Sequence, residues 1–301
     1  MDQLSEGQLL DALKGAIDLH THPAPDIVPR SQTIAETIED FSTAGFAGFV
    51  VKSHVASTAS LCAATSNEQS ATAIGSIALN RPVGGLNPAA VEVAALLGAR
   101  VVWLPTVDSR RQREQAANSP GTAPVWEGAQ AKLAALPGYG PPVTIIEDGR
   151  VVPELHNVLD VVSAYGLLLA TGHLDRDEVF AVLDAAKDHG IERIMVTHPD
   201  LPRQRINLEA QIEMARRGAW IERTMASVLE GKLLIDDAVR GIKACGISST
   251  LLTGDLGQPR NGPIAGGIRK WGTALRGGGF GAEEIRQLLV TNPSTALNHP
   301  F

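Results

Sequence analysis

Asp18-Leu19-His20-Thr21-His22-Pro23 is the stretch that decides the fold of this 301-residue chain. An apolar lead-in, Ala16-Ile17, runs directly into two histidines that stand one residue apart. In a β-strand the side chains of residues i and i+2 point to the same side. A strand over 16–20 would therefore present both imidazoles to one point beyond its C-terminal end. Such a chelating pair suits zinc and its first-row neighbours.

The rest of the chain repeats this arrangement of an apolar strand, a polar strand end and a helix. Seven further strands are predicted over residues 46–51, 73–79, 100–104, 167–171, 193–196, 219–222 and 249–252. Strands that alternate with helical patterns at this spacing form a parallel sheet. Eight such units predict an α/β fold of the (β/α)8 TIM-barrel type. A doubly wound open sheet is the alternative.

An insertion over about 109–152 interrupts the alternation between the fourth strand and its helix. Residues 109–141 are rich in Arg, Gln, Ala, Gly and Pro and show no clear period. Residues 143–152 predict a hairpin, because Asp148-Gly149 between two apolar runs favours a two-residue turn. A connection of this length inside a domain is usually functional or mobile. We expect it to cover the site, and we expect 1–301 to form a single domain.

Composition and charge limit the classes of function. The net charge of −7 gives no reason to expect a nucleic-acid partner, and no apolar run approaches the length of a membrane span. The N-terminus lacks the basic and apolar regions of a signal peptide. Cys62 and Cys245 indicate neither a disulfide framework nor a metal site. We therefore expect a soluble cytoplasmic protein that acts on a small molecule, either as a monomer or as a homo-oligomer.

Five of the eight histidines close a predicted strand, and Asp255 closes the eighth strand in the same way. The five histidines are His20, His22, His54, His173 and His198. In a barrel the C-terminal strand ends meet at one mouth, where active sites lie. Clustered neutral imidazoles without a metal would leave buried lone pairs unpaired, which is costly. The set therefore predicts a divalent metal site.

This ordered set of strand-end residues resembles the amidohydrolase superfamily of metal-dependent TIM-barrel hydrolases. The resemblance implies that His20, His22 and Asp255 bind a first divalent metal ion, with zinc as the expected metal. It also implies that His173 and His198 bind a second metal ion or the substrate.

The end of strand four departs from the family pattern. Family members often carry a carboxylated lysine or a glutamate there as a metal bridge, whereas this strand ends in Trp103-Leu104-Pro105-Thr106. Lys52, at the end of strand two, could instead carry a carbamate and bind metal. It could also hold substrate as an ammonium or form a structural salt bridge. The number of ions, one or two, stays open. His54 shares a face with Lys52 and is expected to contact the substrate or a metal.

The first hypothesis for the activity is hydrolysis of an amide, cyclic amide, imide or lactone bond by a metal-activated water. Asp255 would act as general base, and His198 or His173 would stabilise the developing oxyanion when not bound to metal. Arginines near the strand ends or in the first loop would bind a substrate carboxylate, with a rim salt bridge as the alternative for each. These arginines are Arg30, Arg223 and Arg260.

Two other activities are compatible with the same residues. A metal-dependent decarboxylase of a small aromatic or enol-type acid is the second hypothesis, because the resemblance includes members that break C–C bonds with the same ligands. A non-catalytic metal-binding protein is the third. Structural metal sites are normally closed by four ligands and need no catalytic carboxylate, which disfavours this third hypothesis.

Overall fold

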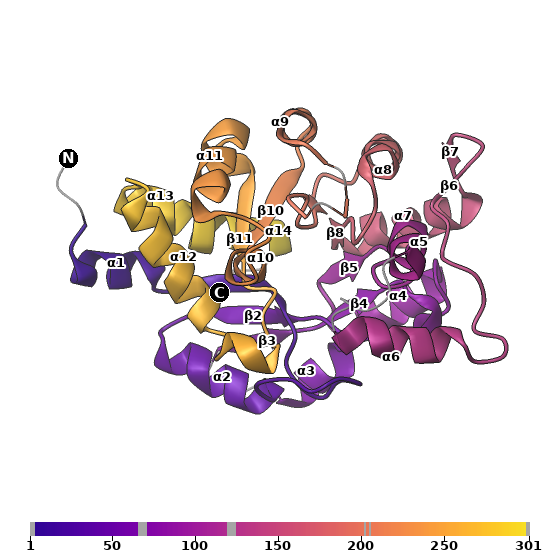
Figure 1. The fold of residues 1–301 in the computed structure, drawn as a ribbon, viewed down its shortest axis with the longest axis horizontal. Helices are drawn as coiled ribbons and strands as arrows, with labels where there is room; N and C mark the ends of the chain where they lie inside the picture. Colours follow the sequence, from indigo (N-terminus) through magenta and orange to yellow (C-terminus); the bar gives the residue numbers. More distant parts are fainter. Residues whose placement is uncertain (1–3, 66–70, 119–124, 202, 205, 299–301) are drawn as a thin grey trace.

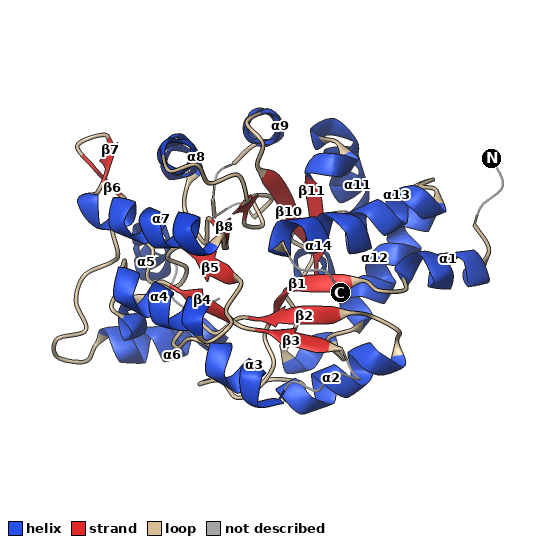
Figure 2. Ribbon diagram, turned by 180° about the vertical axis from the view of Figure 1, so that it is seen from behind, coloured by secondary structure: helices blue, strands red, loops and turns tan. Residues whose placement is uncertain are grey.

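Parallel β-strands form a ring, and helices pack around its outside (Figures 1 and 2). The computed structural model describes residues 4–298 except 66–70, 119–124, 202 and 205. Strands occur at all eight predicted places, and Gly75 splits the third into two elements. In chain order the elements are β1 (Ile17–Thr21), β2 (Gly48–Val51), β3 (Thr72–Ile74), β4 (Ser76–Ala78), β5 (Val101–Trp103), β8 (Leu168–Ala170), β9 (Ile194–Val196), β10 (Trp220–Thr224) and β11 (Thr250–Thr253).

The strands pair in two runs, which meet at two seams. One run pairs β1, β2 and β3, and a second runs from β4 through β5, β8, β9 and β10 to β11, in both cases with parallel neighbours. The chain itself joins the two runs at Gly75. At the other seam the Asp255 amide donates to His20 O and the His22 amide donates to Leu256 O, both at 2.7 Å. The predicted α/β barrel is therefore confirmed, and an open sheet would not make these contacts.

Helices follow the strands and cover their outer faces (Figure 2). The helices of the repeating units are α2 (Ile34–Thr43), α3 (Ala59–Thr65), α4 (Pro88–Leu96), α7 (Pro153–Tyr165), α8 (Arg176–Asp188), α9 (Leu208–Arg216), α11 (Ile235–Cys245) and α12 (Gly266–Gly277). The terminal or short helices are α1 (Glu6–Leu13), α10 (Met225–Leu229), α13 (Ala282–Arg286) and α14 (Asn292–Leu297). Single turns are η1 (Arg81–Val83), η2 (Ile247–Ser249), η3 (Pro259–Asn261) and the π-helical η4 (Gln287–Thr291).

Alternate residues of each strand pack into different layers of the core. On β5, Val102 packs with Leu169 beneath the helices, whereas Val101 and Trp103 pack with Leu168 in a separate cluster. Trp103 also lies against His20, with ring centres 4.6 Å apart. This two-residue period places one set of side chains beneath the helices and the other set in the cluster that contacts His20.

The insertion contains two helices that the sequence pattern did not predict. They are α5 (Arg110–Asn118) and α6 (Val125–Ala134), followed by the predicted hairpin of β6 (Ile146–Glu147) and β7 (Arg150–Val151). The hairpin lies at the opposite end of the molecule from α1 and α13 (Figure 1). α5 has no apolar stripe. Buried Asp108 fixes the insertion instead, since it accepts hydrogen bonds from Gln130 Nε2 at 2.9 Å and Tyr139 Oη at 2.8 Å.

Three further helical segments have distinct local features. α2 begins at Ile34, where Thr33 and Glu36 form a reciprocal capping box. α12 does not follow from the sequence pattern, because it opens with two glycines and contains two more. After α13 the chain continues in the π-helical η4. None of the helices in the described part of the chain is both long enough and apolar enough to span a membrane.

Candidate metal centre and substrate cavity

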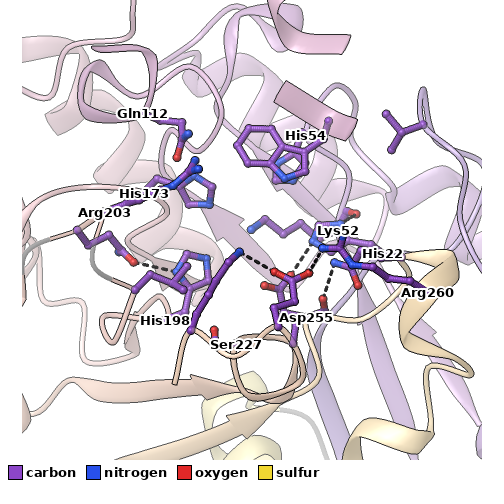
Figure 3. Close-up of a pocket in the computed structure, with 18 of the residues that line it drawn as sticks. His22, Lys52, His54, Gln112, His173, His198, Arg203, Ser227, Asp255 and Arg260 are labelled. Atoms are coloured by element: carbon purple, nitrogen blue, oxygen red, sulfur yellow. Dashed lines mark hydrogen bonds and ion pairs between the residues drawn. The ribbon is translucent and has the colours of Figure 1, made fainter. Parts of the chain in front are cut away.

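Three metal-ligating side chains converge at the seam of the barrel. His20 and His22 lie at the end of β1, and Asp255 follows β11. Asp255 Oδ1 lies 3.2 Å from His20 Nε2 and 3.1 Å from His22 Nε2, and Figure 3 shows Asp255 beside His22. Across the described ranges, this is the one group of three or more such side chains whose ligand atoms all lie within 4.8 Å of each other.

The hydrogen bonds of the two histidines fix their tautomers. His20 Nδ1 lies 2.8 Å from Glu222 Oε1, and His22 Nδ1 lies 2.9 Å from the carbonyl oxygen of Lys52. A carboxylate and a carbonyl accept hydrogen bonds, so each Nδ1 carries the hydrogen. In a neutral imidazole Nε2 then holds a lone pair, and burial lowers the pKa of His22 to about 4. Two nitrogen lone pairs and one carboxylate oxygen therefore face each other, an arrangement that fits a divalent cation.

Asp255 occupies an uncommon backbone conformation with φ at 50°. His198, on the opposite side of the centre, has φ at 26°. Positive φ costs free energy in residues other than glycine and concentrates at functional sites. Burial alone would raise the pKa of Asp255, but hydrogen bonding and positive charge from His20 and His22 in their protonated forms outweigh burial and hold the pKa well below its usual value. A divalent cation between neutral rings would supply positive charge at the same place, so Asp255 is a carboxylate whenever the centre carries positive charge.

Glu222 belongs to the centre, although sequence reasoning did not select it. Its side chain is fully buried on β10, and Oε1 accepts hydrogen bonds from His20 Nδ1 and from Thr253 Oγ1, each at 2.8 Å. Oε2 accepts the His198 amide at 2.9 Å. The feature of the sequence that could have identified Glu222 is an acidic residue directly after the apolar Trp220-Ile221 of a core strand.

Lys52 lies beside the proposed metal position. Its Nζ lies 3.1 Å from His20 Nε2 and 4.0 Å from the centre of the Trp103 ring. Burial lowers the pKa of Lys52 to about 8. Among the described residues, Lys52 forms no ion pair within 4.0 Å, although the charges of Asp255 and Glu222 act on it. After β5, Thr106 binds Asn80 and His54, and the end of this strand supplies neither lysine nor glutamate, as the sequence indicated.

The remaining strand-end histidines form the wall of a cavity (Figure 3). His198 Nδ1 lies 2.8 Å from Gln204 Oε1, so Nδ1 carries the hydrogen and Nε2 is an acceptor in the neutral ring. His173 Nδ1 is buried and has no hydrogen-bond partner among the residues described. Its ring centre lies 5.0 Å from that of His198 and 6.2 Å from those of both His54 and Trp126. Neither His173 nor His198 belongs to the three-ligand group.

The cavity has a volume of about 590 Å³ and a cationic lining. Two of the arginines that the sequence analysis proposed as substrate contacts, Arg30 and Arg260, line this cavity. Arg203 lines it from the loop after β9. Arg30 is paired with Asp26, and Arg260 is paired with Glu230. Trp126 and Gln112 bring the insertion into the wall of the cavity.

Arg223 does not reach the cavity, and its prediction as a substrate contact is corrected. Its side chain is 1% exposed and pairs with Asp200 at 2.6 Å, and it also donates to Gln211 at 3.1 Å. Neighbouring strand residues point to opposite faces. Because Glu222 and Thr224 face the barrel interior, Arg223 points outward between β10 and the helices.

Comparison with solved structures shows the fold of the amidohydrolases. An amidohydrolase from Pseudomonas aeruginosa has a TM-score of 0.63 at 16% identity, with 98% of each chain covered. Amidohydrolase 2 from Bifidobacterium longum subsp. infantis has a TM-score of 0.54 at 12% identity, covering 95% of this chain and 99% of that one. 2,6-Dihydroxybenzoate decarboxylase from Rhizobium has a TM-score of 0.56 at 11% identity, with the same coverage. The resemblance predicted from the strand-end residues is confirmed at the level of the fold.

Residues 15–222 match the model of a family of unknown function, DUF6282, and the chain belongs to that family. The matched range begins just before β1 and ends at Glu222, so it does not include Asp255. A comparison with curated proteins found no match.

Proposed function

We propose that this protein is a metal-dependent hydrolase that cleaves an amide, cyclic amide, imide or lactone bond in a substrate carrying a carboxylate. The observation that carries the proposal is the convergence of His20 Nε2, His22 Nε2 and Asp255 Oδ1 beside a large cationic cavity. Zinc is the expected ion, because two imidazoles and a carboxylate suit it. Three protein ligands are typical of catalytic zinc sites, whereas structural sites are usually closed by four.

One ion per chain is the proposed stoichiometry. His173 and His198 face the cavity but lie outside the three-ligand group, and the described residues contain no second group of three. This geometry favours a substrate contact over a second metal for both histidines.

The proposed mechanism assigns the proton transfer to Asp255. A divalent ion held by the three ligands would lower the pKa of a water and polarise the scissile carbonyl. The contacts of Asp255 with the imidazoles use Oδ1. Oδ2 would accept the proton of the attacking water and return it to the leaving group.

The two wall histidines are assigned different roles by their hydrogen bonds. His198 presents an acceptor, Nε2, because Gln204 occupies its Nδ1 hydrogen. It therefore suits a substrate N–H or O–H group. His173 has an unpartnered Nδ1, so the ring can donate a hydrogen bond to the carbonyl oxygen on which negative charge develops. His54, held by Thr106, would contact the substrate.

Arg30 and Arg260 are the proposed carboxylate contacts. An arginine binds a carboxylate through two parallel hydrogen bonds. Both residues line the cavity, and each guanidinium keeps an acidic neighbour, Asp26 or Glu230. These neighbours fix the arginines in place before the substrate arrives.

A metal-dependent decarboxylase of an aromatic or enol-type acid is the second candidate. The rings of His54, Trp126 and His173 lie about the same distance apart, between 5.8 and 6.2 Å, and a flat acid could lie against them. The likeness of fold to 2,6-dihydroxybenzoate decarboxylase is compatible with this chemistry. Release of CO₂ from candidate acids would distinguish the lyase from the hydrolase.

Metal analysis and one substitution test the proposal. Gently purified protein should contain about one divalent ion per chain, and chelation should abolish turnover of a lactone or cyclic amide that carries a carboxylate. Asp255→Asn should fold normally and lose at least about 100-fold in kcat, as expected for loss of a general base. Asp160→Asn, at an exposed carboxylate, is the matched control. Full activity without metal, or in the Asp255→Asn variant, would refute the mechanism.

A further inference from the structure

Glu222 joins three parts of the site through one buried carboxylate. It receives hydrogen bonds from the ring of His20 on β1, the hydroxyl of Thr253 on β11 and the backbone amide of His198 after β9. The three donor–acceptor distances lie between 2.8 and 2.9 Å. Its side chain is 0% exposed, so water does not compete for these bonds.

The three donors require a carboxylate at this position. Oε1 accepts two hydrogen bonds and Oε2 accepts the third. A carboxylate has about four acceptor sites and no donor, whereas an amide has one acceptor oxygen and two N–H donors. In a Glu222→Gln variant, one orientation of the side-chain amide would point N–H groups at the His198 amide. The other would point them at His20 Nδ1 and Thr253.

We propose that Glu222 is a positioning residue that holds His20 in the metal-binding tautomer and holds His198 in its left-handed backbone conformation. This inference rests on the proposed metal centre. The carboxylate retains the hydrogen on His20 Nδ1, which leaves the Nε2 lone pair for the ion. The same carboxylate binds the backbone amide of His198, whose φ of 26° costs free energy unless neighbouring contacts hold it.

Substitution by glutamine separates this role from a general effect of burial. Carboxylates that orient metal-binding histidines typically change metal affinity by about 10–100-fold when they are replaced. We expect Glu222→Gln to weaken Zn²⁺ binding by that factor. Glu178 provides a matched control, because its side chain is likewise buried, at 2% exposure, but lies on α8 and caps that helix. Glu178→Gln should leave Zn²⁺ affinity within about twofold of the wild-type value.

The measurement is Zn²⁺ affinity by competition with a chromophoric chelator at pH 7.5, with circular dichroism as the check on folding. Turnover at saturating Zn²⁺ gives a second readout, and kcat of Glu222→Gln should stay reduced because His198 is displaced. Wild-type affinity in the folded Glu222→Gln variant, or equal losses in both variants, would overturn the inference while leaving the proposed function intact. Failure of the wild-type chain to bind Zn²⁺ would instead overturn the proposed metal centre and this inference with it.

A second measurement covers the case in which Glu222→Gln does not fold. In metal-free wild-type protein labelled with ¹⁵N-histidine, the His20 resonances, assigned by their loss in His20→Asn, should report a hydrogen on Nδ1. A hydrogen on Nε2 would overturn the inference.

Discussion

Asp255 Oδ1 lies 3.1 Å from His22 Nε2 across the seam where the barrel closes. The backbone enforces this distance, because the His22 amide donates to the carbonyl of Leu256, next to Asp255. Gly257 allows the approach, since a Cβ there would clash with His22 O. The metal ligands are thus placed by the same hydrogen bonds that complete the fold.

Metal binding should therefore stabilise the whole barrel. A ligand that binds only the folded state adds about 2.7 kcal/mol when its concentration is 100 times its Kd. We expect chelation to lower the Tm of the wild-type chain and Zn²⁺ to restore it, as measured by calorimetry. His22→Asn should lose this response, whereas His156→Asn, at a partly exposed histidine on α7, should keep it. Equal Zn²⁺ responses in both variants would contradict the assignment of His22.

Asp18 should make stability depend on pH in metal-free protein. Burial, partly offset by hydrogen bonds from the Gly254 and His20 amides, raises the pKa of Asp18 from 3.8 to about 8. Because the folded-state pKa is the higher one, the folded chain holds a proton that the unfolded chain releases. This contribution is complete below about pH 4 and is lost as the pH rises toward 8, at up to about 1.4 kcal/mol per pH unit.

Asp18→Asn isolates this effect, because the amide oxygen still accepts hydrogen bonds and the side chain stays neutral. Relative to the wild type, the variant should gain free energy of unfolding steadily from pH 5 to pH 8 in urea titrations with chelator. Taking the difference removes the contribution of the buried histidines, which titrate in both proteins. A difference that does not change with pH would show that Asp18 ionises normally.

The strand ends could be predicted from the sequence because each follows a short apolar run. His20, His22 and Asp255 follow from the two-residue period and from the rule that barrel strands end at one mouth. Glu222 and Arg223 could not be separated in this way, because their assignment depends on which face of β10 each occupies. A shift of one residue exchanges the two faces, so the sequence alone does not show whether Glu222 or Arg223 faces the interior.

The helices that escaped prediction give weak helical signals. In α12 the apolar stripe of Ile268, Trp271 and Leu275 is buried, but glycines surround it. α12 contains Gly266, Gly267, Gly272 and Gly277, which weaken any helical pattern. Two of these are there for packing, since a Cβ on Gly272 would lie 3.0 Å from Leu13 and one on Gly267 would lie 3.0 Å from Leu256. α5 is strongly polar, with alanines as its only apolar residues, and Arg111, Gln112 and Gln115 line the cavity.

Gly172 should be indispensable for placing His173. Its φ is 63°, and a Cβ at this position would clash with Leu104 O. Gly190 has a similar φ of 68° with nothing within 4 Å of the Cβ position. We expect Gly190→Ala to cost about 1 kcal/mol for the left-handed backbone and Gly172→Ala to cost about 1–3 kcal/mol more for the clash. Urea denaturation measures the free energy of unfolding of both variants. Equal costs would show that the segments after β5 and β8 can move apart to make room for the added methyl group.

Lys52 should act as a carbamate rather than as an ammonium. Its Nζ lies 3.1 Å from His20 Nε2, an atom assigned to the metal, and two cations this close would repel. Reaction of the neutral amine with CO₂ forms a carbamate and releases one proton, which places a negative charge instead of a positive one beside the three-ligand group. Lys52→Met should therefore lose metal and activity, and short-chain carboxylic acids should partly restore both. Bicarbonate should also increase the activity of the wild-type enzyme after CO₂ has been removed. If neither acids nor bicarbonate has an effect, the ammonium over the Trp103 ring is the functional form and acts on the substrate.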